Sequence, residues 1–136
     1  MKFNPALSFR GQCEAAFKFY ERCFSGNIVT MLAYRDSPNP EQVPEAWREK
    51  IFHATLMVGD NVLMGGDPLP EQYEQPKGFQ LVIGIDDVLE AERIFKALAE
   101  HGTVQMPLQE TFWAVRFGVL VDRFGIPWTI NCEQPR

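Results

Sequence analysis

Cysteine, histidine and clustered positive charge are scarce in this chain. Its 136 residues include three cysteines, two histidines, 13 lysines and arginines, and 18 aspartates and glutamates, which gives a net charge of -5. The cysteines, Cys13, Cys23 and Cys132, are odd in number and form no CxxC pair, so we expect neither a disulfide framework nor a zinc site. Because phosphate binding needs clustered lysine and arginine, we also expect no nucleic-acid partner.

Long apolar runs are absent as well. No segment approaches the roughly 18 consecutive apolar residues of a membrane span, and the N-terminal stretch lacks the apolar run of a signal peptide. We therefore expect a cytoplasmic protein without a membrane partner. The glycine-rich phosphate loop, the GxSxG element and the dinucleotide-binding fingerprint are also missing, so the sequence carries no motif for those chemistries.

The sequence does contain an internal repeat. The interval from Glu14 to Gly26 is the same as the interval from Glu90 to Gly102. Apolar residues recur at helical spacing in both stretches, which predicts one amphipathic helix in each. We expect the glycine at the end of each stretch to adopt the left-handed conformation just past its helix.

Strand-like segments surround each predicted helix in the same order. In the first module they are 3–9, 28–34, 51–58 and 62–65, and in the second they are 79–85, 103–106, 113–121 and 126–132. The prediction is an α+β fold of two tandem βαβββ modules, about 1–66 and 78–136, joined by a proline-containing linker at 67–77. A chain of this length forms one domain, here 1–136. The irregular segment 35–50 is long for a compact domain and is either a lid or a dimer contact.

Arg116 lies in the middle of a strand-like run. Strict alternation places Arg116 on one face with the small residues Ala114 and Gly118, and places Trp113 and Phe117 on the opposite, core face. The small neighbours predict a hollow in which Arg116 contacts an anionic ligand. The alternative is that Arg116 pairs with a carboxylate and serves the sheet.

The turn predicted at 122–125 sets the partners of that strand. It is expected to place Arg116 opposite Asn131, and Gly118 opposite Thr129, so that these side chains share one surface.

A turn after Val58 does the same for the first module, where His53, Thr55 and Met57 are expected to share a face with Met64. His53 is either a hydrogen-bonded structural residue or a general base.

Several runs carry a family resemblance: Met106 to Trp113, Arg116-Phe117-Gly118, Asp122 to Gly125, and Pro127-Trp128. With the tandem βαβββ modules, they resemble the vicinal oxygen chelate superfamily, and within it the PhnB-like branch. That superfamily includes glyoxalases, extradiol dioxygenases and fosfomycin or bleomycin resistance proteins. The resemblance implies a half-open, mostly antiparallel, barrel-like sheet whose concave face holds the ligand, commonly in a homodimer.

The resemblance also implies where a metal would be held. Metal-binding members carry His or Glu at positions that fall here at about Pro5, Met64, Gln80 and Thr129. None of these is His, Asp or Glu, so we expect no metal ligands and no cofactor, and a divalent metal is disfavoured.

These observations favour a PhnB-like small-molecule binding protein with a metal-free cleft for a polar or anionic organic ligand, of the sequestering or resistance type. The expected ligand-binding residues are Arg116, His53, Gln80, Thr129, Asn131 and Met64. The alternative is a metal-dependent lyase, isomerase or dioxygenase of the glyoxalase type, or a methyltransferase-labelled relative. Catalysis is left open, no catalytic residue is assigned, and the expected partners are the ligand and a second copy of the chain.

Overall fold

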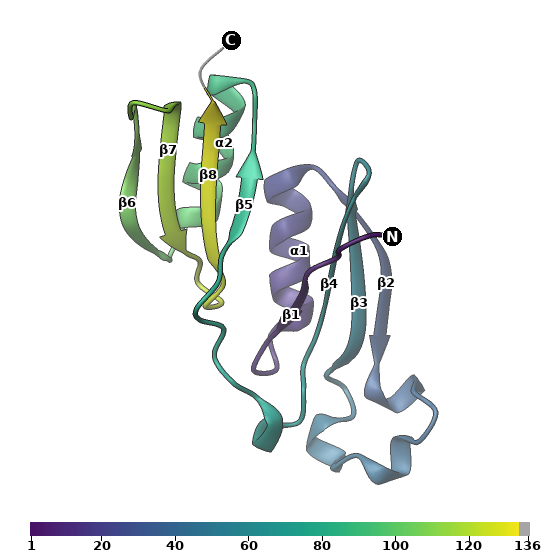
Figure 1. Ribbon diagram of the computed structural model, residues 1–136. Coiled ribbons are helices and arrows are strands. Elements are labelled where there is room, and N and C mark those ends of the chain that lie inside the picture. The colour runs from purple at the N-terminus through teal and green to yellow at the C-terminus, as the bar shows by residue number, and fades with distance from the viewer. Residues whose placement is uncertain (134–136) are drawn as a thin grey trace. The chain divides into compact units, whose positions relative to one another are not determined.

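The computed structural model describes residues 1–133, and the chain divides into two compact units, Met1–Gln75 and a second unit that begins at Pro76 (Figure 1). The first unit contains β1 (Ala6–Ser8), α1 (Cys13–Phe24), β2 (Asn27–Ala33), β3 (Ile51–Val58) and β4 (Asn61–Gly66). The second contains β5 (Leu81–Gly84), α2 (Val88–Ala99), β6 (Thr103–Gln109), β7 (Ala114–Val121) and β8 (Pro127–Glu133). The tandem βαβββ prediction is confirmed, and the boundary between the units along the chain falls within the predicted linker. That the two units form a single domain stays a prediction.

Each unit has one open, four-stranded sheet. The strand orders are β1-β4-β3-β2 and β5-β8-β7-β6. The pairs β1–β4 and β5–β8 are parallel and the other pairs are antiparallel, so both sheets are mixed. The predicted α+β class, mostly antiparallel, is therefore confirmed.

Short 3-10 turns occupy the irregular segments. The segment between β2 and β3 contains η1 (Tyr34–Asp36), η2 (Pro40–Gln42) and η3 (Glu45–Trp47), and η4 (Pro70–Gln72) follows β4. Among the helices of residues 1–133, none combines the length and the apolar character needed to cross a membrane. The three cysteines are free, and all three are buried.

A ring from each helix rests on a glycine of its sheet. A Cβ atom at Gly65 would lie 2.7 Å from the Phe17 ring of α1, and a Cβ atom at Gly118 would lie 2.6 Å from the Phe95 ring of α2. Both distances are shorter than real Cβ contacts, so a side chain at either glycine would push the helix away. The space beside Gly118 thus belongs to α2, which corrects the prediction of a ligand hollow at that position.

The glycines that follow the helices have a different role from the one predicted. The left-handed residues are Ser25, with φ of 54°, and His101, with φ of 60°, each one position before the glycine. A Cβ atom at Gly26 would lie 2.7 Å from the carbonyl oxygen of Met57, and one at Gly102 would lie 2.5 Å from that of Val121. These glycines therefore allow the chain to pass close to a neighbouring strand.

The predicted register of the hairpin between β7 and β8 is wrong by one residue. Gly118 pairs with Ile130, Val119 with Thr129, and Phe117 with Asn131.

The carboxylate of Asp122 explains the shift in register. It accepts hydrogen bonds from the backbone N–H groups of Phe124 at 2.8 Å and Ile126 at 3.0 Å, and from the Trp128 indole at 2.8 Å. These bonds shape a turn in which the β7–β8 pairing starts at Val121 and Pro127. A slip of one residue changes every facing pair.

The faces of β7 are also the reverse of the prediction. Ala114 and Leu120 are fully buried, and Gly118 is packed under Phe95, so this is the face that α2 covers. Trp113, predicted to be core, has 43% of its surface exposed. In the first unit the prediction is confirmed: Thr55 pairs with Met64 across β3 and β4, so His53, Thr55 and Met57 share the face of Met64.

Candidate functional site

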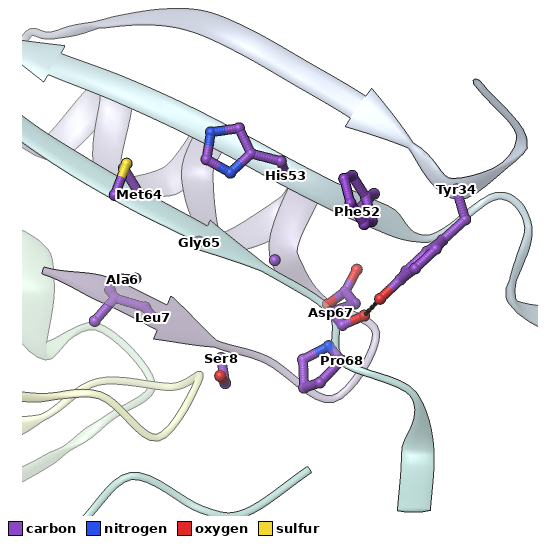
Figure 2. A pocket seen from close by; sticks show the side chains of 11 residues that line it. Ala6, Leu7, Ser8, Tyr34, Phe52, His53, Met64, Gly65, Asp67 and Pro68 are labelled. Carbon is purple, nitrogen blue, oxygen red and sulfur yellow. Dashed lines mark hydrogen bonds between the residues drawn. The ribbon is translucent and has the colours of Figure 1, made fainter. Parts of the chain in front are cut away.

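A pocket of about 310 Å³ lies on the first unit (Figure 2). Its lining side chains come from β1, η1, β3, β4 and the residues after β4, and they include Ser8, Tyr34, Phe52, His53, Met64 and Asp67. The structure therefore brings together two of the predicted ligand-binding residues, His53 and Met64. None of the described residues that line the pocket is lysine or arginine.

Phe52 and His53 both line the pocket although they are adjacent in a strand. The β2–β3 pairing shifts at this point, since Leu32 pairs with His53 but Ala33 pairs with Ile51. Phe52 is the extra residue of this irregularity, and such irregularities redirect side chains. Alternation alone does not predict Phe52 at the site.

Tyr34 and Phe52 form an aromatic corner. Their ring centroids lie 5.4 Å apart and the ring planes meet at 74°. Phe52 remains 47% exposed, so much of its surface is free to contact a ligand. Aromatic faces of this kind provide apolar contact area and attract positive charge.

His53 is half-buried, and its Nε2 lies 3.0 Å from the hydroxyl oxygen of Thr55. That contact fixes the imidazole on the sheet face. Ser8 and Asp67 line the same pocket, but within the described residues no hydrogen bond joins either of them to His53. The three residues therefore do not form the relay that activates a serine nucleophile.

Asp67 is 1% exposed and fastens three elements together. Its carboxylate accepts hydrogen bonds from the backbone N–H groups of Cys13 at 3.0 Å and Ile51 at 2.9 Å. Its backbone carbonyl accepts one from the Tyr34 hydroxyl at 2.7 Å and one from the Trp47 indole at 3.3 Å. Asp67 therefore connects the start of α1, the start of β3 and the irregular segment that forms one wall of the pocket.

Burial changes the titration of this cluster. It raises the pKa of Asp67 above its ordinary value, even though N–H donors from Ile51 and Cys13 act to lower it. Burial, followed by the charge of Asp67, raises the pKa of Tyr34, and the same two causes in the same order raise the pKa of Cys13. Negative charge is thus disfavoured around Asp67.

Three further predicted residues lie in the second unit. The Thr129 hydroxyl donates a hydrogen bond to the Gln80 side-chain carbonyl at 2.7 Å. Asn131 lies two positions after Thr129 on β8, and so on the same face, where its amide nitrogen is 3.4 Å from a carboxylate oxygen of Glu133. Thr129 therefore contacts Gln80 and shares a face of β8 with Asn131, and their role as ligand contacts stays a prediction.

Arg116 does not join them. Its Nε lies 3.1 Å from the Glu92 carboxylate of α2, and its Nη1 donates to the carbonyl of Val115 at 2.8 Å. Arg116 pairs with Cys132, so it lies on the face that α2 covers, opposite the face of Thr129 and Asn131. The alternative reading, in which Arg116 pairs with a carboxylate, is the one that the structure supports.

The residues present do not fit a divalent metal. Among residues 1–133 there is no group of three or more His, Cys, Asp or Glu side chains that could hold one. Met64 offers a soft thioether, which suits the hard divalent cations poorly, and Gln80 and Thr129 are hydrogen-bonded to each other. We therefore derive no chemical step through a metal.

The residues that sequence reasoning missed are Tyr34, Phe52 and Asp67. The available signal was an aspartate directly after the Gly65-Gly66 pair at a strand end, where a carboxylate commonly anchors backbone N–H groups. Tyr34 carries no comparable signal, because its hydroxyl donates to a backbone carbonyl, and every residue has one.

Known proteins match this chain along its length. The model of the family described as 3-demethylubiquinone-9 3-methyltransferase matches residues 1–131. Protein YjdN of Escherichia coli (strain K12) is 33% identical over 145 residues, which cover 99% of this chain and 99% of that protein. The crystal structure of protein PA1353 from Pseudomonas aeruginosa is 46% identical, with a TM-score of 0.91 and 99% of each chain covered.

A more distant structure shows the same fold. The fosfomycin resistance protein FosX from Mesorhizobium loti is 14% identical, with a TM-score of 0.62, and the match covers 98% of this chain and 92% of that one. These matches show a fold of the glyoxalase and bleomycin resistance type. The fold of this chain is the one that the sequence resemblance implied, that of the vicinal oxygen chelate superfamily. The chain itself belongs to the PhnB-like family that carries the 3-demethylubiquinone-9 3-methyltransferase description.

Proposed function

We propose that this protein binds a small organic molecule in the pocket of its first unit. The observation that carries the proposal is the combination of a volume of about 310 Å³, an aromatic corner, a thioether and a fixed imidazole on one sheet face. Ligand pockets in proteins are typically concave, mostly apolar and equipped with a few placed polar groups. Ligand contact by Gln80, Thr129 and Asn131 of the second unit stays a prediction, and the Thr129 hydroxyl already donates a hydrogen bond to Gln80.

Non-covalent binding, as in a sequestering protein, accounts for the site better than catalysis does. Among residues 1–133, the hydrogen-bonding partner of His53 is the Thr55 hydroxyl and no carboxylate orients its ring, so a general base has no supporting partner there. Methyl transfer would require room for a methyl donor and an acceptor together. A pocket of about 310 Å³ is at the small end of the range for a single ligand.

The test is a thermal-shift screen of small aromatic amines, alcohols and acids on the wild-type protein, followed by titration of each hit. A ligand present at about 100 times its dissociation constant stabilises the folded state by roughly 2.7 kcal/mol, which a melting curve resolves. We expect His53→Ala to weaken a hit by about tenfold, since it removes a hydrogen-bonding ring from the pocket wall.

Arg116→Ala is the matched control, because it removes a polar side chain that faces α2. It should change the affinity by less than threefold. A hit that Arg116→Ala weakens and His53→Ala leaves intact would place the ligand in the second unit and overturn the proposal. Homodimer formation and a cytoplasmic location stay predictions, the first to be measured by light scattering in solution.

A further inference from the structure

The charge of the pocket wall points to a ligand class different from the anion expected from the sequence. With Arg116 bound to Glu92 on the helix-covered face, the predicted anion contact is absent from the pocket. The described residues that line the pocket include no lysine or arginine, whereas they include Asp67, whose carboxylate is buried and bonded to backbone N–H groups. An anion entering this pocket would lose its water without gaining a full positive charge as a partner.

Lys50 is the cation that acts on Asp67. Its Nζ donates a hydrogen bond to the carbonyl of Gly11 at 3.1 Å and lies 5.8 Å from the centroid of the Trp47 ring. It is not among the residues that line the pocket. Despite this lysine, the pKa of Asp67 stays above its ordinary value because burial outweighs the compensating groups. Additional positive charge nearby would stabilise the carboxylate, and additional negative charge would destabilise it.

The aromatic corner adds a second attraction for positive charge. The rings meet edge to face, at 74° with centroids 5.4 Å apart, and Phe52, which is 47% exposed, keeps ring surface free for a ligand. Each ring face carries partial negative charge and attracts a cation, the more strongly the further the cation is desolvated. An alkylated ammonium group suits this environment because it is large, weakly hydrated and has little need of hydrogen-bond acceptors.

We propose that the pocket selects organic cations with an alkylated ammonium group, held against Tyr34 and Phe52, over neutral and anionic molecules of the same size. This inference rests on the proposed function and names its ligand class. The net charge of -5 acts in the same direction at long range. Screening at physiological salt limits that general effect to about 8 Å, so most of the selectivity arises from the pocket wall.

The test uses three probes that share one ring: benzyltrimethylammonium, benzyl alcohol and benzoate. Each is titrated into the full chain at 0.15 M salt, and the backbone amide signals of Phe52 and His53 are followed by NMR. The cation should bind at least about fivefold more tightly than the alcohol, as expected for about 1 kcal/mol of cation–π energy, and benzoate should bind weakest. Equal or tighter binding of benzyl alcohol or benzoate overturns the inference.

Two variants distinguish the effect of the pocket on cation affinity from the effect of the protein's net charge. Phe52→Leu keeps an apolar side chain but removes the ring, and it should reduce the affinity for the cation about fivefold while changing that for benzyl alcohol less than twofold. Phe112→Leu is the matched control, because Phe112 is 93% exposed and lies in the second unit. Retention of cation selectivity in Phe52→Leu contradicts the inference. If none of the three probes shifts the pocket signals, the proposed function itself fails, which is a different outcome from equal binding of all three.

Discussion

At the scale of single residues, the contact between Gly118 and Phe95 shows how closely α2 packs on its sheet, and a substitution there tests that packing. A methyl group at position 118 would lie 2.6 Å from Cε2 of Phe95 and 3.0 Å from the backbone Cα of Leu108. The backbone cannot yield easily, so we expect Gly118→Ala to lower the free energy of unfolding by about 1 to 3 kcal/mol. Urea unfolding followed by circular dichroism measures this change.

Gly84→Ala is the matched control for that substitution. Gly84 is also in a strand of the second sheet, but a Cβ atom there would meet nothing within 4 Å. Its unfolding free energy should stay within about 0.5 kcal/mol of wild type, or rise slightly because alanine restricts the unfolded chain. Equal destabilisation by both substitutions would show that the close approach at Gly118 is not the cause.

The same glycine shows what sequence reasoning could not decide. A small residue beside Arg116 leaves space on a strand face, and that space suits a ligand or a helix ring equally well. Alternation identifies which residues share a face, but it does not say which face a helix covers. The Phe95 ring occupies the space, so the predicted hollow beside Gly118 is wrong, although Arg116 and Gly118 do share a face of β7.

At the scale of elements, the segment between β2 and β3 is held in part by two side-chain hydrogen bonds that share one acceptor, the carbonyl of Asp67. Its two ends are joined by bonds from the Tyr34 amide to Lys50 and from the Arg35 amide to Arg48, both 2.9 Å. Its side chains Tyr34 and Trp47 then converge on the carbonyl of Asp67. This wall of the pocket therefore depends in part on the single carbonyl of Asp67.

Tyr34→Phe tests this attachment. Loss of the hydroxyl removes a 2.7 Å hydrogen bond, worth about 0.5 to 1.5 kcal/mol, so exchange of the Arg35 amide hydrogen should become about two- to tenfold faster. Amides of β7 should be unaffected. Hydrogen exchange measured by NMR gives both values.

Tyr73→Phe is the control, since the Tyr73 ring contacts Arg10 and its hydroxyl makes no hydrogen bond within residues 1–133. If the two variants exchange alike, the bond to Asp67 does not hold the segment.

The order of the elements was predictable because the helical and strand periodicities repeat along the chain. The face of His53 was also predictable, since a two-residue turn fixes the β3–β4 register. The β7–β8 register was not, because it depends on the side-chain bonds of Asp122 within the turn. The attachment of Tyr34 escaped prediction for a related reason: its acceptor is a backbone group, which has no sequence signature.

At the scale of the whole molecule, the buried thiol of Cys13 makes stability depend on alkaline pH. Burial raises the pKa of this thiol far above its ordinary value of 9.0. Above about pH 9 the unfolded chain therefore binds fewer protons than the folded protein, and the free energy of unfolding falls as pH rises. For one proton the slope is about 1.4 kcal/mol per pH unit.

Cys13→Ala removes this contribution. We expect urea unfolding between pH 8 and pH 10.5 to show a shallower alkaline decline in the variant than in the wild type, whatever the variant's stability at pH 8. Comparing slopes separates the loss of the titrating thiol from the loss of packing, which lowers the curve uniformly. Parallel curves would show that the thiol does not ionise on unfolding in this range.

Because all three cysteines are buried, the rate at which each thiol reacts reports how often its surroundings open. Cys13 and Cys23 belong to the first unit and Cys132 to the second, and none is exposed in the folded chain. An alkylating reagent should modify each thiol only when its surroundings open, so the order in which peptides gain mass records which unit comes apart first. A bound molecule that delays alkylation of Cys13 and Cys23 but not of Cys132 would thereby be located in the first unit, without any label on the molecule.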